Sequence, residues 1–234
     1  MKKLVTLVFM ILALSAVAFA GETQLQKATN VLNEIMAAPD KGIPQDLLDK
    51  AVCVGIVPSE IKGAFIVGGT YGRGVLVCRR HGNGPWGPPS MFTLGAGSFG
   101  FQIGGEATDV VFIVQNEAGV RKLVQDNVKL GADLSATAGP VGRTGEAATD
   151  AQLHAEILSY SRTRGLFAGA SLDGAVVKQD KSDNRELYGR KVTAREILID
   201  GVVAVPPAAR PLNRALARYS PRGGQAFASL RTSP

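Results

Sequence analysis

Two residues with catalytic potential stand close together in the C-terminal half of the chain. A single residue separates His154 from Glu156. On an alternating strand they would share a face, where they could act as a general acid and base. The same H-x-E spacing begins the zinc-deaminase signature, but its second half, P-C-x-x-C, does not occur in this sequence. A solvated strand face explains the pair better, so we predict that the protein is not an enzyme and keep a periplasmic hydrolase as the least favoured alternative.

A glycine-rich segment, Gly95–Gly100, matches the dinucleotide-binding pattern G-x-G-x-x-G. That pattern holds pyrophosphate only where it joins a strand to the start of a helix. The residues that follow, Gly100–Gly105, alternate as in a strand, so we interpret these glycines as bends in a sheet. With two histidines and two cysteines in 234 residues, we predict neither a cofactor nor a bound metal.

Basic residues give a clearer signal than the candidates for catalysis. Arg210, Arg214 and Arg218 recur at every fourth position, as on one face of a helix whose other face is apolar. Such a helix could lie on an anionic membrane, and a helix docked on the protein by its leucines is an equal alternative. A second basic set surrounds a predicted hairpin, with Arg73 expected in an exposed turn. The predicted lipid-binding residues are Lys62, Arg73, Arg79, Arg80, Arg210, Arg214 and Arg218.

The first twenty residues are typical of an export signal. Lys2 and Lys3 precede an apolar run, and Ala18-Phe19-Ala20 ends in a cleavage pattern. Retention of this segment as an anchor is the alternative. We therefore predict an exported, periplasmic protein and expect no nucleic-acid partner. In an oxidising compartment we expect Cys53 and Cys78 to form a disulfide, the alternative being two buried thiols.

Removal of that segment leaves 24 basic residues against 20 acidic ones, a net charge of +4. Residues 201–234 contain five arginines and no acidic residue. This basic end on a nearly neutral body favours an anionic surface as partner.

The elements that must position these residues follow from hydrophobic periodicity. A capping box at Thr23–Gln26 predicts the start of an amphipathic helix at residues 24–37. Strands then follow one another, including a continuous strand at Val128–Ala138, with one helix at residues 117–127 between them. Asn116 is placed to cap the helix at 117–127, and a second capping box at Thr193–Glu196 predicts a short helix. A last helix is predicted at residues 211–219.

Because strands follow strands rather than alternating with helices, we predict an α+β fold with a mostly antiparallel sheet. The 28 glycines, many inside strand segments, indicate that this sheet is strongly curved or barrel-like. We predict that residues 21–208 form one domain and that residues 209–234 form a basic tail with a short helix.

Three glycine-rich segments carry a family resemblance. Gly68–Gly74, Gly95–Gly104 and Leu166–Ala175 resemble, in order, the SYLF-domain family, also called the Ysc84-type actin-binding domain. The resemblance covers residues 25–208 and implies a lipid-binding module with no catalytic residues. Eukaryotic members bind phosphoinositides and, in fungi, actin; bacterial secreted members are described as periplasmic lipid-binding proteins.

Taken together, these features predict an exported protein that attaches peripherally to anionic phospholipid. An apolar contact from the helix at 24–37, or from Phe92, Phe99 and Phe101, would add to the electrostatic attraction. The alternative is a module of the cell envelope that binds another protein.

Overall fold

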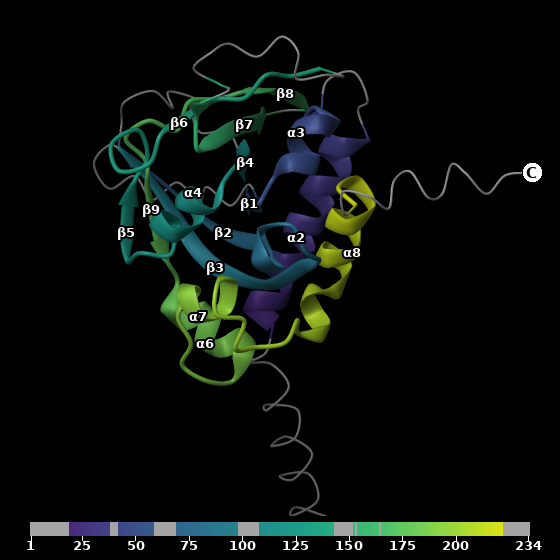
Figure 1. Ribbon diagram of the computed structural model, residues 1–234, viewed down its shortest axis with the longest axis vertical. Coiled ribbons are helices and arrows are strands. Elements are labelled where there is room, and N and C mark those ends of the chain that lie inside the picture. Colours follow the sequence, from purple (N-terminus) through teal and green to yellow (C-terminus); the bar gives the residue numbers. More distant parts are fainter. Residues whose placement is uncertain are drawn as a thin grey trace, which may run out of the picture.

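The computed structural model describes residues 19–37, 42–58, 69–97, 108–142, 152, 154–163 and 165–221. They form an α+β fold in which one strongly curled sheet carries helices on both faces (Figure 1). The helices are α2 (Phe19–Met36), α3 (Gln45–Lys50), α4 (Glu117–Leu123), α6 (Lys181–Tyr188), α7 (Ala194–Leu198) and α8 (Arg210–Tyr219), with 3-10 turns η1 (Arg80–Gly82) and η3 (Pro207–Ala209). The strands are β1 (Cys53–Val57), β2 (Gly69–Arg79), β3 (Trp86–Gly97), β4 (Thr108–Val114), β5 (Asn127–Lys129), β6 (Ala136–Ala138), β7 (Ile157–Thr163), β8 (Leu166–Gly169) and β9 (Val176–Gln179).

The strands make one sheet in the order β5-β9-β3-β2-β1-β4-β7-β6, and β8 also pairs with β7. The pairing is antiparallel throughout except between β6 and β7. The predicted fold class and curved, mostly antiparallel sheet are therefore confirmed.

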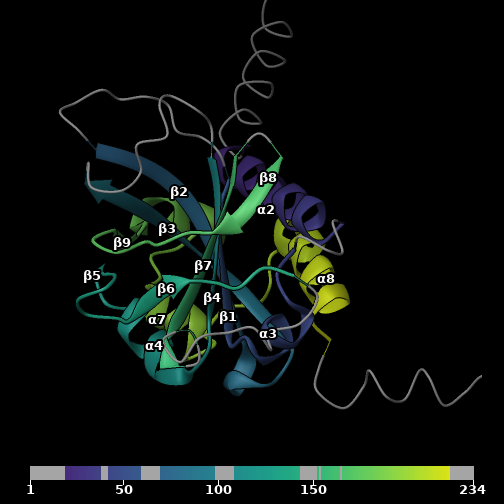
Figure 2. The same ribbon diagram turned by 90° about the horizontal axis from the view of Figure 1, so that it is seen from above.

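The short connection between the two end strands of the sheet shows that the sheet is curled. β5 and β6 lie at opposite ends of the strand order, yet only six residues separate Lys129 from Ala136. A chain of that length spans at most about 25 Å when fully extended, so the sheet must bend into a half-barrel (Figure 2). The prediction of one continuous strand at Val128–Ala138 is wrong, because a turn at residues 131–133 divides it.

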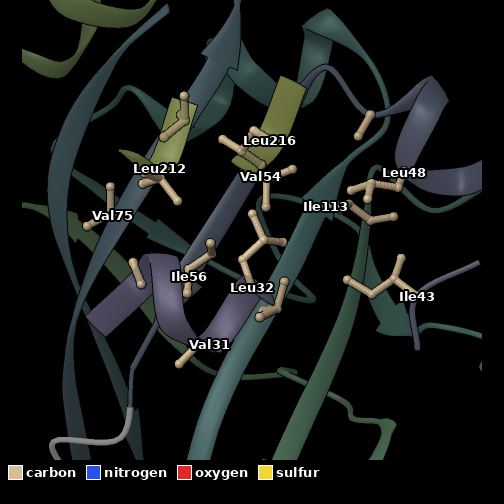
Figure 3. Close-up of a cluster of buried hydrophobic side chains, with 14 of the residues drawn as sticks. Val31, Leu32, Ile43, Leu48, Val54, Ile56, Val75, Ile113, Leu212 and Leu216 are labelled. Carbon is tan, nitrogen blue, oxygen red and sulfur yellow. The ribbon is translucent and has the colours of Figure 1, made fainter. Parts of the chain in front are cut away.

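One face of the sheet packs against α2, α3 and α8. Alternate residues of the central strands, Val54 and Ile56 of β1 among them, meet Leu32 of α2 and Leu216 of α8 (Figure 3). The predicted amphipathic helix exists, but it begins at Phe19, so Thr23 lies inside it rather than at its cap. Its apolar side is part of the core and is not available to a membrane.

The other face of the sheet encloses a second core, and its glycines make room for aromatic rings. A Cβ atom added to Gly55 would lie 2.2 Å from Cζ of Phe112, and one added to Gly74 would lie 2.4 Å from Cζ of Phe92. The two rings meet edge to face with centroids 5.6 Å apart. Phe92 is only 3% exposed and therefore cannot contact a membrane. The segments at 98–107, including Phe99, Phe101 and the end of the G-x-G-x-x-G match, lie outside the described residues.

Local sequence patterns correctly predicted where two helices begin. The Asn116 side chain accepts a hydrogen bond from the Gly119 amide at 2.8 Å and caps α4. Thr193 and Glu196 form a capping box at the start of α7. Each contact joins residues three positions apart, so the residue types at that spacing are enough to predict it.

Candidate anionic-surface site

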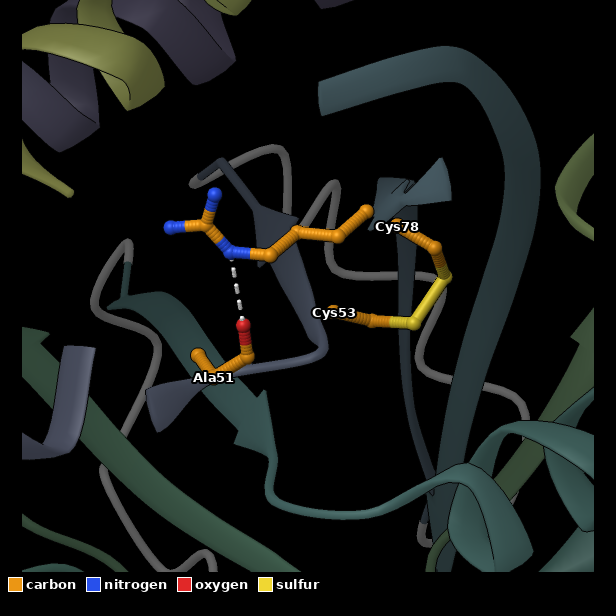
Figure 4. The surroundings of a disulfide bond; sticks show 4 residues. Ala51, Cys53 and Cys78 are labelled. Carbon is orange, nitrogen blue, oxygen red and sulfur yellow. Dashed lines mark hydrogen bonds between the residues drawn. A yellow bond between two sulfur atoms is a disulfide. The ribbon is translucent and has the colours of Figure 1, made fainter. Parts of the chain in front are cut away.

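The end of β2 is tied to its neighbours by a disulfide and a buried arginine. Cys53 and Cys78 are opposite one another in β1 and β2 and are joined, as expected, by a disulfide (Figure 4). Arg79 follows directly and is 5% exposed. Its Nε donates to the Ala51 carbonyl at 3.1 Å, and its guanidinium lies 4.2 Å from the centre of the Trp86 ring.

The same guanidinium holds the end of α8. Nη2 of Arg79 donates to the carbonyl and to the Oγ of Ser220, at 2.8 and 2.6 Å. The Ser220 hydroxyl in turn donates to the Leu48 carbonyl at 2.7 Å. Arg79 is thus used to fasten α8 and α3 to the sheet, and it has no surface to offer a bilayer.

Arg73 is also engaged within the protein. The turn predicted around it is wrong, because the residue lies in β2 opposite Thr93. Its guanidinium forms an ion pair with Asp183 and lies 4.0 Å from Asp180. Burial raises the pKa of the Asp183 carboxyl, although the Arg73 charge acts in the opposite direction. The electrostatic role of Arg73 is therefore to accompany a buried acid.

Helix α8 presents its arginines outward. Leu212, Ala215 and Leu216 are at most 4% exposed in the core shared with α2, so the helix is docked on the protein by its apolar side. Arg210, Arg214 and Arg218 are exposed on the opposite side. None of the three has an acidic partner within the described ranges.

The fold also brings a distant arginine to this region. Arg80 is exposed in η1, directly after the Arg79 that binds Ser220 at the end of α8. We call Arg210, Arg214 and Arg218 the arginine face. It contains three of the seven predicted lipid-binding residues, and Arg80 is exposed in the turn after Arg79. Arg73 and Arg79 are engaged within the protein, and Lys62 lies outside the described residues.

His154 and Glu156 do not share a strand face, the arrangement that the predicted acid–base pair required. His154 is exposed in a helical turn, not on a strand. The Glu156 carboxylate accepts hydrogen bonds from Lys122 Nζ at 2.9 Å and from the Ser135 amide at 3.1 Å. Burial acts to raise the pKa of Glu156, but these hydrogen bonds outweigh it and the pKa falls below its ordinary value. A carboxylate so held stays ionised and is poorly suited to donate a proton.

Sequence reasoning missed a group of basic residues around α6. Lys178 and Lys181 line a hollow of about 600 Å³, and Lys181 continues into a second one of about 520 Å³ with Arg185 and Lys191. Acidic residues interrupt this stretch of sequence, and Lys181 pairs with Asp126 at 2.8 Å. Counting lysines and arginines along the sequence, without subtracting the acidic residues, would have revealed this group. The acidic residues between them lower its net charge.

Within the part of the chain that the structure describes, none of the helices has the length and apolar character needed to cross a bilayer. Over the same residues, no three histidine, cysteine or acidic side chains gather as metal ligands would.

Comparison with known proteins gives the chain a family. The Ysc84 family profile, described as "Las17-binding protein actin regulator", matches residues 95–219, which is more than half of the chain. The chain belongs to the Ysc84 family. The resemblance drawn from its glycine-rich segments is thereby confirmed at the level of the family.

The similarity extends to fungal and vertebrate proteins. Protein YSC84 of Saccharomyces cerevisiae is 36% identical over 204 residues, covering 83% of this chain and 43% of that protein. SH3 domain-containing protein PJ696.02 of Schizosaccharomyces pombe is 40% identical over 177 residues, covering 74% and 40%. Human SH3 domain-containing YSC84-like protein 1 is 33% identical over 183 residues, covering 76% and 53%. The chain spans about half the length of the curated relatives it matches.

Proposed function

We propose that this member of the Ysc84 family is an exported binding module that attaches to anionic phospholipid surfaces through its arginine face. One observation carries the proposal: Arg210, Arg214 and Arg218 form an exposed row without acidic partners among the described residues. Adjacent members of this row are four residues apart, a rise of about 6 Å along the helix. Such spacing lets several headgroups be contacted at once.

The attachment we propose is electrostatic. The apolar sides of α2 and α8 are buried in one core, so neither helix can enter the acyl region without leaving the protein. Each basic residue close to an anionic surface contributes about 1 kcal/mol, so the three arginines of α8 would contribute about 3 kcal/mol together. Screening at high salt would remove most of this energy, because the Debye length falls from about 10 Å at 0.1 M to about 3 Å at 1 M.

Export to the periplasm is part of the same proposal. It is supported by the sequence pattern of residues 1–20 and by the Cys53–Cys78 disulfide, since such bonds persist in oxidising compartments. Trypsin mapping of the protein from its own cells, with and without disruption of the outer membrane, would test this part directly.

A protein partner is the second candidate for the same surface. It is favoured by the name of one relative, LAS seventeen-binding protein 3 of Saccharomyces cerevisiae, which is 34% identical over 216 residues. An acidic protein surface would recognise the arginine face by the same charge complementarity.

The deciding experiment is vesicle flotation of residues 21–234, with neutral vesicles and with vesicles containing phosphatidylglycerol, at low and high salt. We expect binding only to the anionic vesicles and its loss at high salt. Reversal of the row, Arg210→Glu with Arg214→Glu and Arg218→Glu, should weaken binding by at least about 100-fold, since about 3 kcal/mol is removed.

A matched control separates this face from net charge. Lys178→Glu with Arg185→Glu and Lys191→Glu makes the same change in charge at exposed positions around α6. The control should retain most of the binding. An equal loss in both variants would mean that total charge, not the arginine face, attracts the vesicle, and no binding by the unaltered protein would favour the protein partner.

A further inference from the structure

A cavity of about 300 Å³ lies beside the disulfide, between the end of β2, α4 and α7. Its apolar lining comes from residues far apart in sequence: Val52 and Cys78 at the β1–β2 pair, Val120 of α4 and Leu198 of α7. All four belong to or pack against the second core of the sheet. The rigid sheet end and its disulfide therefore form one wall of the cavity, while two helices form the others.

Four charged residues also line the cavity: Arg79, which is held by Ala51 and Ser220, and Glu117, Arg121 and Arg195. Arg121 comes from α4 and Arg195 from α7, and their side chains are 62% and 63% exposed. Among the described residues each has one loose acidic neighbour: Glu117 Oε2 lies 3.3 Å from Arg121 Nη1, and Asp200 Oδ2 lies 3.9 Å from Arg195 Nε. Exposed pairs of this kind are worth about 0–1 kcal/mol, so either arginine can turn to a stronger anionic partner.

The backbone at the cavity wall is held in an uncommon conformation. His81, which lines the cavity, has φ 53° and ψ 36°, in the left-handed region, where it is alone among the non-glycine residues that the structure describes. Gly82 follows with φ 75°, and a Cβ there would lie 2.8 Å from the Glu117 carboxylate. Left-handed backbone at a residue other than glycine costs about 1 kcal/mol or more and is concentrated at binding sites.

We propose that this cavity binds a small amphiphilic anion, a single aliphatic chain of medium length that ends in a carboxylate. The chain would occupy the apolar part of the cavity, and the carboxylate would accept hydrogen bonds from Arg121 and Arg195, which can each bind a carboxylate through two N–H groups. A volume of about 300 Å³ is at the lower end for ligand sites, which favours one chain over a two-chain lipid.

This site is distinct from the arginine face and does not depend on it. Attachment to vesicles would use exposed charge on α8, whereas the cavity combines recessed apolar surface with the two arginines of α4 and α7. Either function can therefore fail without the other. Ile199, which is 38% exposed and lines the cavity, adds an apolar contact for an incoming chain.

Isothermal titration calorimetry of the full chain with decanoate, below its micelle concentration, tests the proposal. We expect saturable binding of one decanoate, with decanol and decyltrimethylammonium at least about tenfold weaker. Arg195→Gln and Arg121→Gln should each weaken decanoate binding about tenfold and bring its affinity closer to that of decanol. Val52→Phe, which fills the cavity, should abolish binding of both the carboxylate and the alcohol.

Arg185→Gln is the matched control, because it removes an exposed arginine that does not line this cavity. It should leave the titration unchanged. Three results would overturn the proposal: binding that does not saturate, equal affinity for decanoate and decanol, or unchanged decanoate affinity in both Arg121→Gln and Arg195→Gln. Those two variants test the proposal even if Val52→Phe does not fold.

Discussion

Strand β2 and helix α8 both carry arginines but use them in opposite ways. Arg79 is buried among carbonyl groups and an indole ring, and Arg73 accompanies a buried carboxylate. The arginines of α8 face solvent. The difference follows from what surrounds each arginine: Arg79 lies where β2 is buried and Arg73 meets the acids of α6, whereas α8 has apolar residues to bury on one side only. Basic residues stay exposed to solvent where the fold leaves one side of their element uncovered.

Arg79→Met offers the strongest test of this contrast. It keeps the apolar stem but removes the hydrogen bonds to Ala51 and Ser220, leaving buried carbonyls unsatisfied. We expect the free energy of unfolding to fall by about 3 kcal/mol, measured by urea denaturation. Arg80→Met, one residue along and exposed, should change it by less than about 0.5 kcal/mol. Equal effects would remove the distinction between buried and displayed arginines.

Arg73→Gln should have the next largest effect. It leaves the Asp183 carboxylate, 6% exposed, without its cation, and we expect a loss of about 2 kcal/mol, because the arginine itself is partly solvated. Adding Asp183→Asn should restore part of this stability in the same denaturation assay. A double variant no better than the single one would mean that the ion pair is not the source of the loss.

Glu156→Gln tests an acidic residue whose carboxylate is also bound within the protein. Lys122 and Ser135 hold the pKa of Glu156 below its ordinary value despite its burial. As the pH falls, the unfolded chain therefore takes up this proton before the folded protein does. The stabilisation is complete above the unfolded pKa of about 4.3 and is lost as the pH falls through the lower folded value.

We accordingly expect Glu156→Gln to cost about 1 kcal/mol at neutral pH, with the difference from the unaltered protein shrinking in acid. Denaturation curves recorded between neutral pH and pH 3 would measure this. A difference that stays constant across that range would show that the Glu156 charge contributes nothing.

The smallest effect on stability is expected at the arginine face itself. Arg210→Gln with Arg214→Gln and Arg218→Gln should change the free energy of unfolding by less than about 0.5 kcal/mol, because these side chains have no acidic partners among the described residues. Thermal unfolding of this variant beside Arg79→Met gives the direct comparison. Destabilisation of similar size in both would make the row structural.

The sequence was most informative where partners are close along the chain. The arginine row of α8 and the caps of α4 and α7 depend on contacts three or four residues apart, and all were predicted. The roles of Arg73 and Arg79 were not, because their partners Asp183 and Ser220 lie 110 and 141 residues away. A sequence pattern shows that a residue is basic, but only the fold shows which carbonyl or carboxylate meets it.

For the sheet, the curvature was predicted but the position of its end strands was not. The number of glycines predicted strong curvature, since that is a property of composition. The division of residues 128–138 between opposite ends of the strand order was missed, because each short strand is selected by its neighbour, β9 or β7. The cavity beside the disulfide was missed for a similar reason, as it joins elements distant in sequence.

The rings that rest on glycines in the sheet have a consequence for how this protein can diverge. Gly55 and Phe112 occupy one shared volume, as do Gly74 and Phe92. A larger residue at the glycine has no space until the ring is gone, and loss of the ring first leaves a void in the core. Each pair is thus open to change only through a less stable intermediate, so the two members should tend to be inherited together.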